Sequence, residues 1–275
     1  MCLFLRALTF QSLRRYDLWF LSLLASLVLL SITLLLGHPS LLKELANLDI
    51  LVEMISRAQN KYTGSPDSLA ILKIHLAYSS YLIIHLLGLL TVLLLAVGNP
   101  LDDKSIIIPF ASVPVSRLYL FATEFFSNLL PAVIFLFFPG FIALINIILA
   151  GIQFLPLFTS FTFLFVKLIF LLLLFILIRE FSGAVVAGLL APTIYFCSHL
   201  GDVFARLAEQ LESPWYLGAR LLQIILPPLH RTGFFAFYTY QKQPVLLPLD
   251  LVIILGFSIL FLGFAYLQYQ RRDLI

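Results

Sequence analysis

The sequence predicts an all-α, polytopic membrane protein, built as a bundle of six transmembrane helices with amphipathic helices at the membrane interface. Hydrophobic residues make up 61% of its 275 residues and charged residues only 11%, whereas a soluble domain carries about 25% charged residues. Because so few charges cannot cover a water-facing surface, most of the surface must face lipid. The apolar residues also form long continuous runs, whereas the strands of a membrane barrel alternate apolar and polar residues.

Six apolar runs approach or exceed the roughly 20 residues that a helix needs to cross a bilayer. They lie at about 18–37, 74–98, 118–150, 158–178, 184–200 and 249–268. The third is too long for one straight crossing. Pro131 and the Pro139–Gly140 pair are expected to kink it or to divide it in two, because proline removes a backbone donor and crowds the preceding turn.

Six crossings place both chain ends on the same side, and the basic residues suggest which side. Lys and Arg close to helix ends favour the cytoplasm. Those on the side of the two termini are Arg6, Arg14, Arg15, Lys104, Arg117, Arg179, Arg271 and Arg272. We therefore expect a single transmembrane domain over 1–275 in the cell membrane, with cytoplasmic N- and C-termini.

Two longer loops then lie on the outer side, at about 38–73 and 201–248. The first repeats apolar residues at helical spacing, at Leu41, Leu45, Leu48, Val52 and Ile55, which predicts an amphipathic helix. That helix either lies on the membrane or a partner, or caps the bundle. The second loop predicts another short amphipathic helix, over 203–212, followed by an aromatic cluster typical of the membrane interface.

The chemistry of membrane enzymes is missing from the sequence. It contains no GxSxG and no HExxH motif, and its five histidines are scattered along the chain. Metal sites need clustered His, Cys or carboxylate ligands. We therefore expect no catalytic residues, no metal site and no enzymatic activity in this chain.

Two polar side chains inside the runs are candidates for a transport pathway, Lys167 and His85. An ionisable residue within a membrane span indicates function by default, but Lys167 also fits a side chain that extends to the outer surface. His85 shares a polar stripe with His75, Tyr78 and Ser79, and hydrogen bonds between helices explain such a stripe equally well. Glu124, near the start of the third run, is expected close to the inner surface, paired with an arginine.

A polar island separates the second run from the third, within the loop at about 99–117. From Asp102 to Arg117 it reads DDKSIIIPFASVPVSR. The island is too polar to join either neighbouring helix, and too rich in apolar residues and proline for an ordinary solvated linker. This composition favours a docking element on the cytoplasmic side, although a simple turn on the membrane surface would also carry such charges.

The island resembles the cytoplasmic loop of type-2 ABC transporter permeases, where acidic and hydroxyl residues precede an apolar stretch and a Pro–hydrophobic–Ser–Arg run opens the third helix. The positions that carry this resemblance are Asp102, Asp103, Ser105, Pro114, Val115, Ser116 and Arg117. The segment LPPLH at 226–230 and the basic ending QRRDL at 270–274 also resemble that family in order and spacing.

The resemblance implies a permease subunit of an ATP-driven transporter, working as an exporter. Two permease subunits would pair in the bilayer above two separate ATP-binding-cassette ATPase subunits, and the island would form a coupling helix docked on the ATPase. The sequence holds no GxxxxGK[ST] phosphate loop, so ATP would be bound by the partner and this chain would need no cofactor.

An alternative is a non-transporting membrane scaffold or assembly factor, with the outer loops as its working surface. Both interpretations make the lipid bilayer a partner and neither includes nucleic acid. The charge of the chain is close to balanced, at +3, and does not indicate a highly charged cargo.

Overall fold

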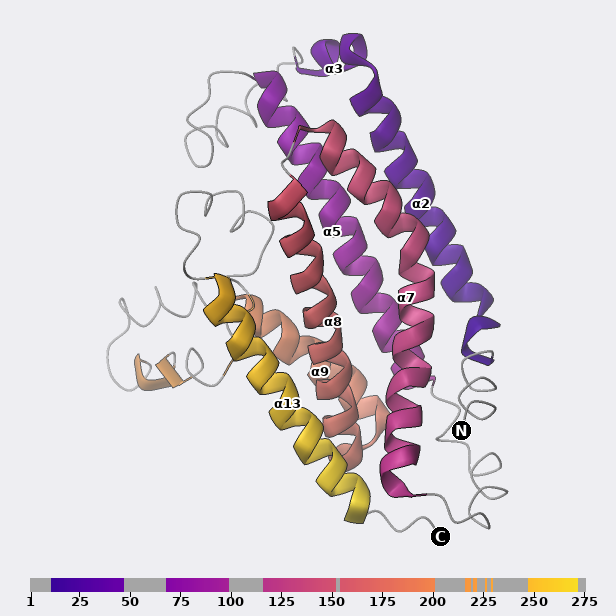
Figure 1. The fold of residues 1–275 in the computed structure, drawn as a ribbon, viewed down its shortest axis with the longest axis vertical. Coiled ribbons are helices and arrows are strands. Elements are labelled where there is room, and N and C mark those ends of the chain that lie inside the picture. Colours follow the sequence, from indigo (N-terminus) through magenta and orange to yellow (C-terminus); the bar gives the residue numbers. More distant parts are fainter. Residues whose placement is uncertain are drawn as a thin grey trace.

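The computed structural model describes residues 11–46, 68–98, 116–151, 154–200 and 247–271, together with a few residues between 216 and 229. Regular structure in these ranges is helical throughout, which confirms the all-α prediction (Figure 1). The helices are α2 (Tyr16–Gly37), α3 (Pro39–Ala46), α5 (Ser68–Val97), α7 (Arg117–Leu149), α8 (Phe154–Ser182), α9 (Ala184–His199) and α13 (Leu247–Arg271).

Four helices are long and apolar enough to cross a membrane, and they correspond to the first four predicted runs. Their span-length parts are Tyr16–Gly37, Leu72–Val97, Arg117–Leu149 and Phe161–Ser182. The fifth and sixth runs form helices whose apolar parts are shorter, Ala184–His199 and Val252–Gln268. With 16 residues, α9 is about 24 Å long at the usual rise per residue, somewhat less than the roughly 30 Å of a hydrocarbon core.

The prolines of the third run bend α7 without dividing it. The helix is continuous over 33 residues with Pro131 and Pro139 inside, and it changes direction in its upper half (Figure 1). Pro139 has no N–H to donate to the carbonyl of Phe135, four residues earlier. Ser22 of α2 donates its hydroxyl to that carbonyl at 2.7 Å. A neighbouring helix thus satisfies the backbone group that the proline leaves open, as a membrane interior requires.

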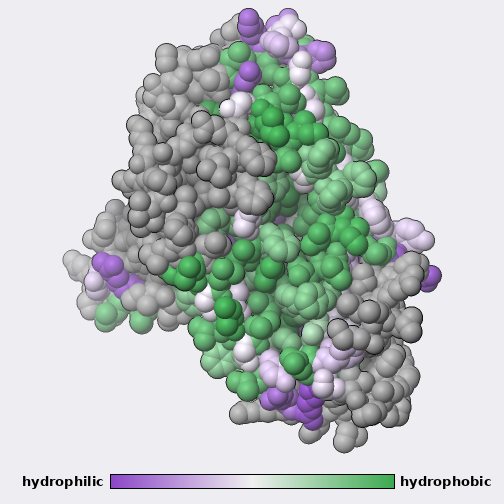
Figure 2. All heavy atoms as spheres, viewed as in Figure 1, coloured by the Kyte–Doolittle hydropathy of each residue, from purple (hydrophilic) through white to green (hydrophobic). Residues whose placement is uncertain are grey.

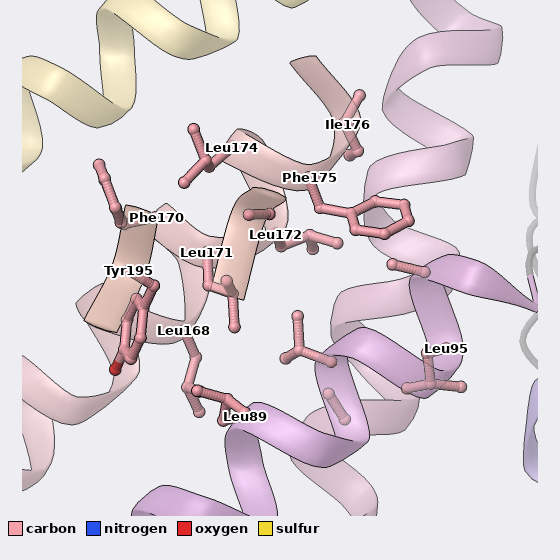
Figure 3. Packing of buried hydrophobic residues seen from close by; sticks show 14 of the residues in the cluster. Leu89, Leu95, Leu168, Phe170, Leu171, Leu172, Leu174, Phe175, Ile176 and Tyr195 are labelled. Atoms are coloured by element: carbon pink, nitrogen blue, oxygen red, sulfur yellow. The ribbon is translucent and has the colours of Figure 1, made fainter. Parts of the chain in front are cut away.

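The centre of the bundle is α8. It packs against α13, α9 and α5, while α7 packs mainly against α5 and α2. Its stretch from Phe170 to Ile176 is buried at every position. In Figure 3, Leu171 of this stretch points towards α5, where Leu89 and Leu95 lie, and Leu174 points the opposite way. An all-round apolar helix of this kind is expected at the core of a bundle.

One asparagine joins three helices by hydrogen bonds. Asn146 of α7 is fully buried, and its amide donates to the Leu29 carbonyl at 2.9 Å and to the Ser80 hydroxyl at 3.1 Å. Its side-chain oxygen accepts from Thr33 at 2.6 Å. Interhelical hydrogen bonds of this kind hold membrane bundles together, because lipid provides no competing partner.

The connection from α8 to α9 is a single residue, Gly183. Its φ of 87° and ψ of 168° lie in a region that is essentially restricted to glycine. The sharp reversal brings α9 back along α8, so that the two helices pack as a hairpin.

The first outer loop begins with the predicted amphipathic helix, α3. Leu42 is buried against Ile32 and Leu36 of α2 and Leu72 of α5, so the start of this helix caps one end of the bundle. Leu41, which the helical spacing placed in the apolar stripe, is 47% exposed. The rest of that predicted helix and the helix predicted over 203–212 lie outside the described residues.

Exposed apolar side chains cover much of the bundle between its two ends (Figure 2). They come from α2, α7, α9 and α13, with Phe20, Leu23, Phe137, Val185 and Ile259 among the most exposed. A soluble monomer rarely exposes so large an apolar surface. The surface therefore supports a membrane location.

The start of α2 contacts the end of α5, and the start of α7 contacts the end of α13. Arg15, which precedes α2, donates to the Leu94 carbonyl near the end of α5 at 2.7 Å. Phe121, in the second turn of α7, lies with its ring 5.8 Å from that of Tyr266 near the end of α13. In Figure 1 these ends lie in the lower half, with α3 at the opposite end.

Candidate functional site

Lys167 lies deep inside α8. It is only 1% exposed, and α8 begins at Phe154, so the helix start is about 20 Å away along the axis at the usual rise. The span-length part of α8 begins at Phe161, less than two turns before Lys167. A pathway role for Lys167 and an extension of its side chain to the outer surface therefore both stay predictions.

His85 of α5 faces the same interior and joins α9. Its Nε2 is hydrogen-bonded to the hydroxyl of Tyr195, and the two ring centroids lie 5.8 Å apart. Tyr195 is completely buried, whereas His85 is half-buried. Lys167 and His85 interact electrostatically. The two pathway candidates predicted from the sequence therefore belong to the same part of the bundle interior.

Two further residues complete the group, which we name the central polar cluster: Tyr81, His85, Lys167, Tyr195 and His199. The His199 ring lies 5.5 Å from that of His85 and 4.7 Å from that of Tyr195. The Tyr81 ring lies 6.2 Å from that of His85. The histidines are scattered along the sequence, but α5 and α9 bring His85 and His199 together in space.

The proton position on His199 follows from its partner. Its Nδ1 lies 2.9 Å from the carbonyl oxygen of Tyr195, and a carbonyl only accepts hydrogen bonds, so Nδ1 carries the hydrogen. Tyr195 thus touches both histidines, one through its hydroxyl and the other through its backbone.

The cluster is rich in donors and poor in negative charge. An ammonium, two imidazoles and two phenols converge from α5, α8 and α9, and these helices carry a single acidic residue, Glu180, near the end of α8. Positive charge at this depth interacts strongly, because the surroundings screen it weakly. The cluster can therefore donate hydrogen bonds to a polar or anionic group, or exchange protons with one.

No metal site is built within the described parts of the chain. Nowhere in those ranges do three His, Cys, Asp or Glu side chains come together in a way that would hold an ion. The cluster offers two imidazoles, fewer than the three or four protein ligands of an ordinary zinc site.

A second polar group lies where α7 begins and α8 ends. Arg179 pairs with Glu124 of α7 and also lies 3.1 Å from Glu180. The pairing of Glu124 with an arginine is confirmed, but Glu124 is 1% exposed and Arg179 7%. Both are therefore enclosed by protein, and Arg179 lies inside α8 rather than in a turn after it.

Of the island residues, Ser116 and Arg117 are described. Ser116 is the N-cap of α7, and its hydroxyl accepts a hydrogen bond from the Tyr119 backbone at 3.3 Å. Arg117 is the first residue of α7 and is exposed. The island therefore leads directly into α7 at a defined helix start. Asp102, Asp103, Ser105 and Pro114 lie outside the described residues.

Tyr195 and His199 were not predicted as site residues from the sequence. A usable signal was present, because Tyr195 and His199 are four residues apart, as are Tyr81 and His85, and such pairs share a helix face. No sequence pattern indicated that α5 and α9 are in contact.

A comparison of the chain with protein-family models gave no match, and a comparison with curated proteins gave none either.

Proposed function

We propose that this chain is the permease subunit of an ATP-driven exporter of the type-2 ABC class, and that ATP is bound and hydrolysed by a separate ATPase subunit. The observation that carries the proposal is the polar island, which leads into the capped and exposed start of α7. Its residues resemble the loop by which such permeases dock on their ATPase. A chain without a phosphate loop can use ATP only if another chain binds and hydrolyses it.

In this proposal α9 and α13 supply the fifth and sixth crossings in the cell membrane. A helix somewhat shorter than the bilayer is accommodated by local thinning of the lipid. The N- and C-termini lie in the cytoplasm with the island. The position of the exposed Arg117, at the end of the bundle where α13 also ends (Figure 1), supports this orientation, because basic residues near helix ends favour the cytoplasm.

A second copy of the chain, or a related permease, completes the pathway across the membrane. The central polar cluster contributes Lys167 and His85 to that pathway. Docking would move α7 relative to α8, and the buried Glu124–Arg179 pair joins these two helices close to the island. ATP shifts such an arrangement only through its different affinity for the two states.

The docking step is tested by co-purification with a co-expressed P-loop ATPase, sought first among the reading frames beside this gene. Reversing the charge at Asp103 and Arg117 together is expected to reduce recovery of the ATPase by at least about tenfold, since opposed like charges cost on the order of 1–2 kcal/mol or more. Reversal of Lys43 in α3, at the other end of the bundle, is the matched control and should leave recovery unchanged. Undiminished recovery with the double variant would remove the docking role, and recovery of other membrane proteins instead would favour the scaffold alternative.

A further inference from the structure

An apolar cavity opens on the side of the bundle, and one of its wall residues, Phe161, packs its ring against Tyr81 of the central polar cluster. It has a volume of about 190 Å³ and lies between α5, α7 and α8. Its walls are aliphatic and aromatic throughout, and Ile84, Leu136, Gly140, Phe165 and Leu168 are among the residues that form them. None of the described residues that line it has a polar side chain, so the cavity does not suit a charged or hydrogen-bonding ligand.

The shape of the cavity follows from two glycines. At Gly88 of α5, a Cβ atom would lie 2.8 Å from the Leu168 side chain, so α5 and α8 meet closely there. At Gly140, which follows Pro139 in α7, a Cβ atom would meet nothing within 4 Å. The helices are thus pressed together on one side of the cavity and leave open space on the other, where α7 changes direction (Figure 1).

The open side of the cavity belongs to the apolar surface of the span-length helices. Phe137, at its rim, is 66% exposed, and Val133 and Phe165 are exposed beside it. This surface is continuous with the exposed apolar side chains along the bundle, which face lipid. The molecules in contact with the opening are therefore bilayer lipids, whose chains are as apolar as the walls.

The size of the cavity allows a lipid acyl chain to enter but excludes a helix of a partner protein. An apolar cavity of roughly 150 Å³ already accepts a benzene molecule, so the present cavity takes a stretch of several methylene groups. A helix of a partner protein, with a diameter of about 10–12 Å including side chains, is too wide to enter it. We propose that this cavity is a binding site for one acyl chain of a bilayer phospholipid, an assignment that does not depend on whether an ATPase drives the protein.

The proposal is tested by native mass spectrometry of the full-length protein released from phosphatidylethanolamine–phosphatidylglycerol nanodiscs. The wild-type chain is expected to retain one phospholipid after the outer lipids are stripped. Gly140→Leu adds a side chain to the cavity wall, at a position where a Cβ atom would meet nothing within 4 Å, and should abolish that retention. Gly263→Leu places the same side chain at an equally open glycine of α13 and should retain the lipid.

A second measurement uses the wild-type chain alone, so the test does not depend on the folding of a variant. A phospholipid with a photoreactive group in its acyl chain should label residues 133–140 and 161–168 more heavily than the exposed faces of α2 and α13. Even labelling of all exposed faces would overturn the proposal. Retention of the lipid by Gly140→Leu would overturn it as well. If that variant also lost the ability to form a dimer, the cavity would be the site for a side chain of a second copy.

Discussion

Replacing Arg179 with alanine is expected to lower the free energy of unfolding by about 3–5 kcal/mol, the usual cost of removing one partner from a buried ion pair. Glu124 is almost completely enclosed, and Glu180 lies beside the same guanidinium. Without Arg179, two carboxylates remain close together in surroundings that screen charge poorly. Chemical denaturation of the purified protein in detergent measures the change.

Two further variants separate the buried charge from the lost packing. A double replacement, Glu124→Leu with Arg179→Met, removes both charges and keeps the volume, and it should restore most of the lost stability, because apolar side chains often replace a buried ion pair at little cost. Glu180→Gln leaves the Glu124–Arg179 pair intact and should cost less stability than Arg179→Ala, because the amide oxygen can still accept a hydrogen bond from the Arg179 guanidinium. If Arg179→Ala proved as mild as Glu180→Gln, the pair would not be a buried structural link.

Replacing Lys167 with methionine is expected to abolish function while leaving the fold intact or slightly more stable. Methionine keeps a similar length and removes the charge, and a buried charge is costly within a membrane. A purely structural lysine would therefore be dispensable, whereas a pathway lysine would not. The readout is restoration of the phenotype of a gene deletion, alongside the amount of folded protein in the membrane.

The matched control for this variant is Lys73→Met, at the start of α5 and away from the central polar cluster, which should restore the phenotype fully. Lys167→Arg keeps the charge and should retain part of the function. Full restoration by Lys167→Met at wild-type protein levels would exclude Lys167 from the pathway.

The long helices were predictable because each is apolar over the length of a bilayer, and that signal needs no knowledge of neighbours. The fifth and sixth predicted runs were less well defined as crossings, because α9 and the apolar part of α13 fall short of that length. The effect of Pro139 was foreseen as a kink or a break. The helix stays continuous with the help of Ser22, which is far away in sequence and donates a hydrogen bond to the free carbonyl of Phe135.

The candidate site was predictable only in part, for the same physical reason. Lys167 and His85 stood out because a polar side chain is conspicuous in an apolar run. Their electrostatic interaction was not deducible, since it depends on how α5, α8 and α9 pack, and the His85–Tyr195 hydrogen bond joins residues 110 positions apart. Glu124 was expected near the surface because its sequence neighbours gave no sign that the end of α8 would cover it.

The most direct test of the central claim is whether the island touches an ATPase. In a chain whose Cys2 and Cys197 are replaced by alanine, a thiol-specific photo-crosslinker is attached to the Ser105→Cys variant and, as control, to Ser40→Cys in α3 at the opposite end. The account predicts a crosslink from the S105C variant to the co-expressed ATPase subunit and none from the S40C variant. A properly inserted S105C chain that gives no crosslink to the ATPase, or one that labels only lipid, would contradict it.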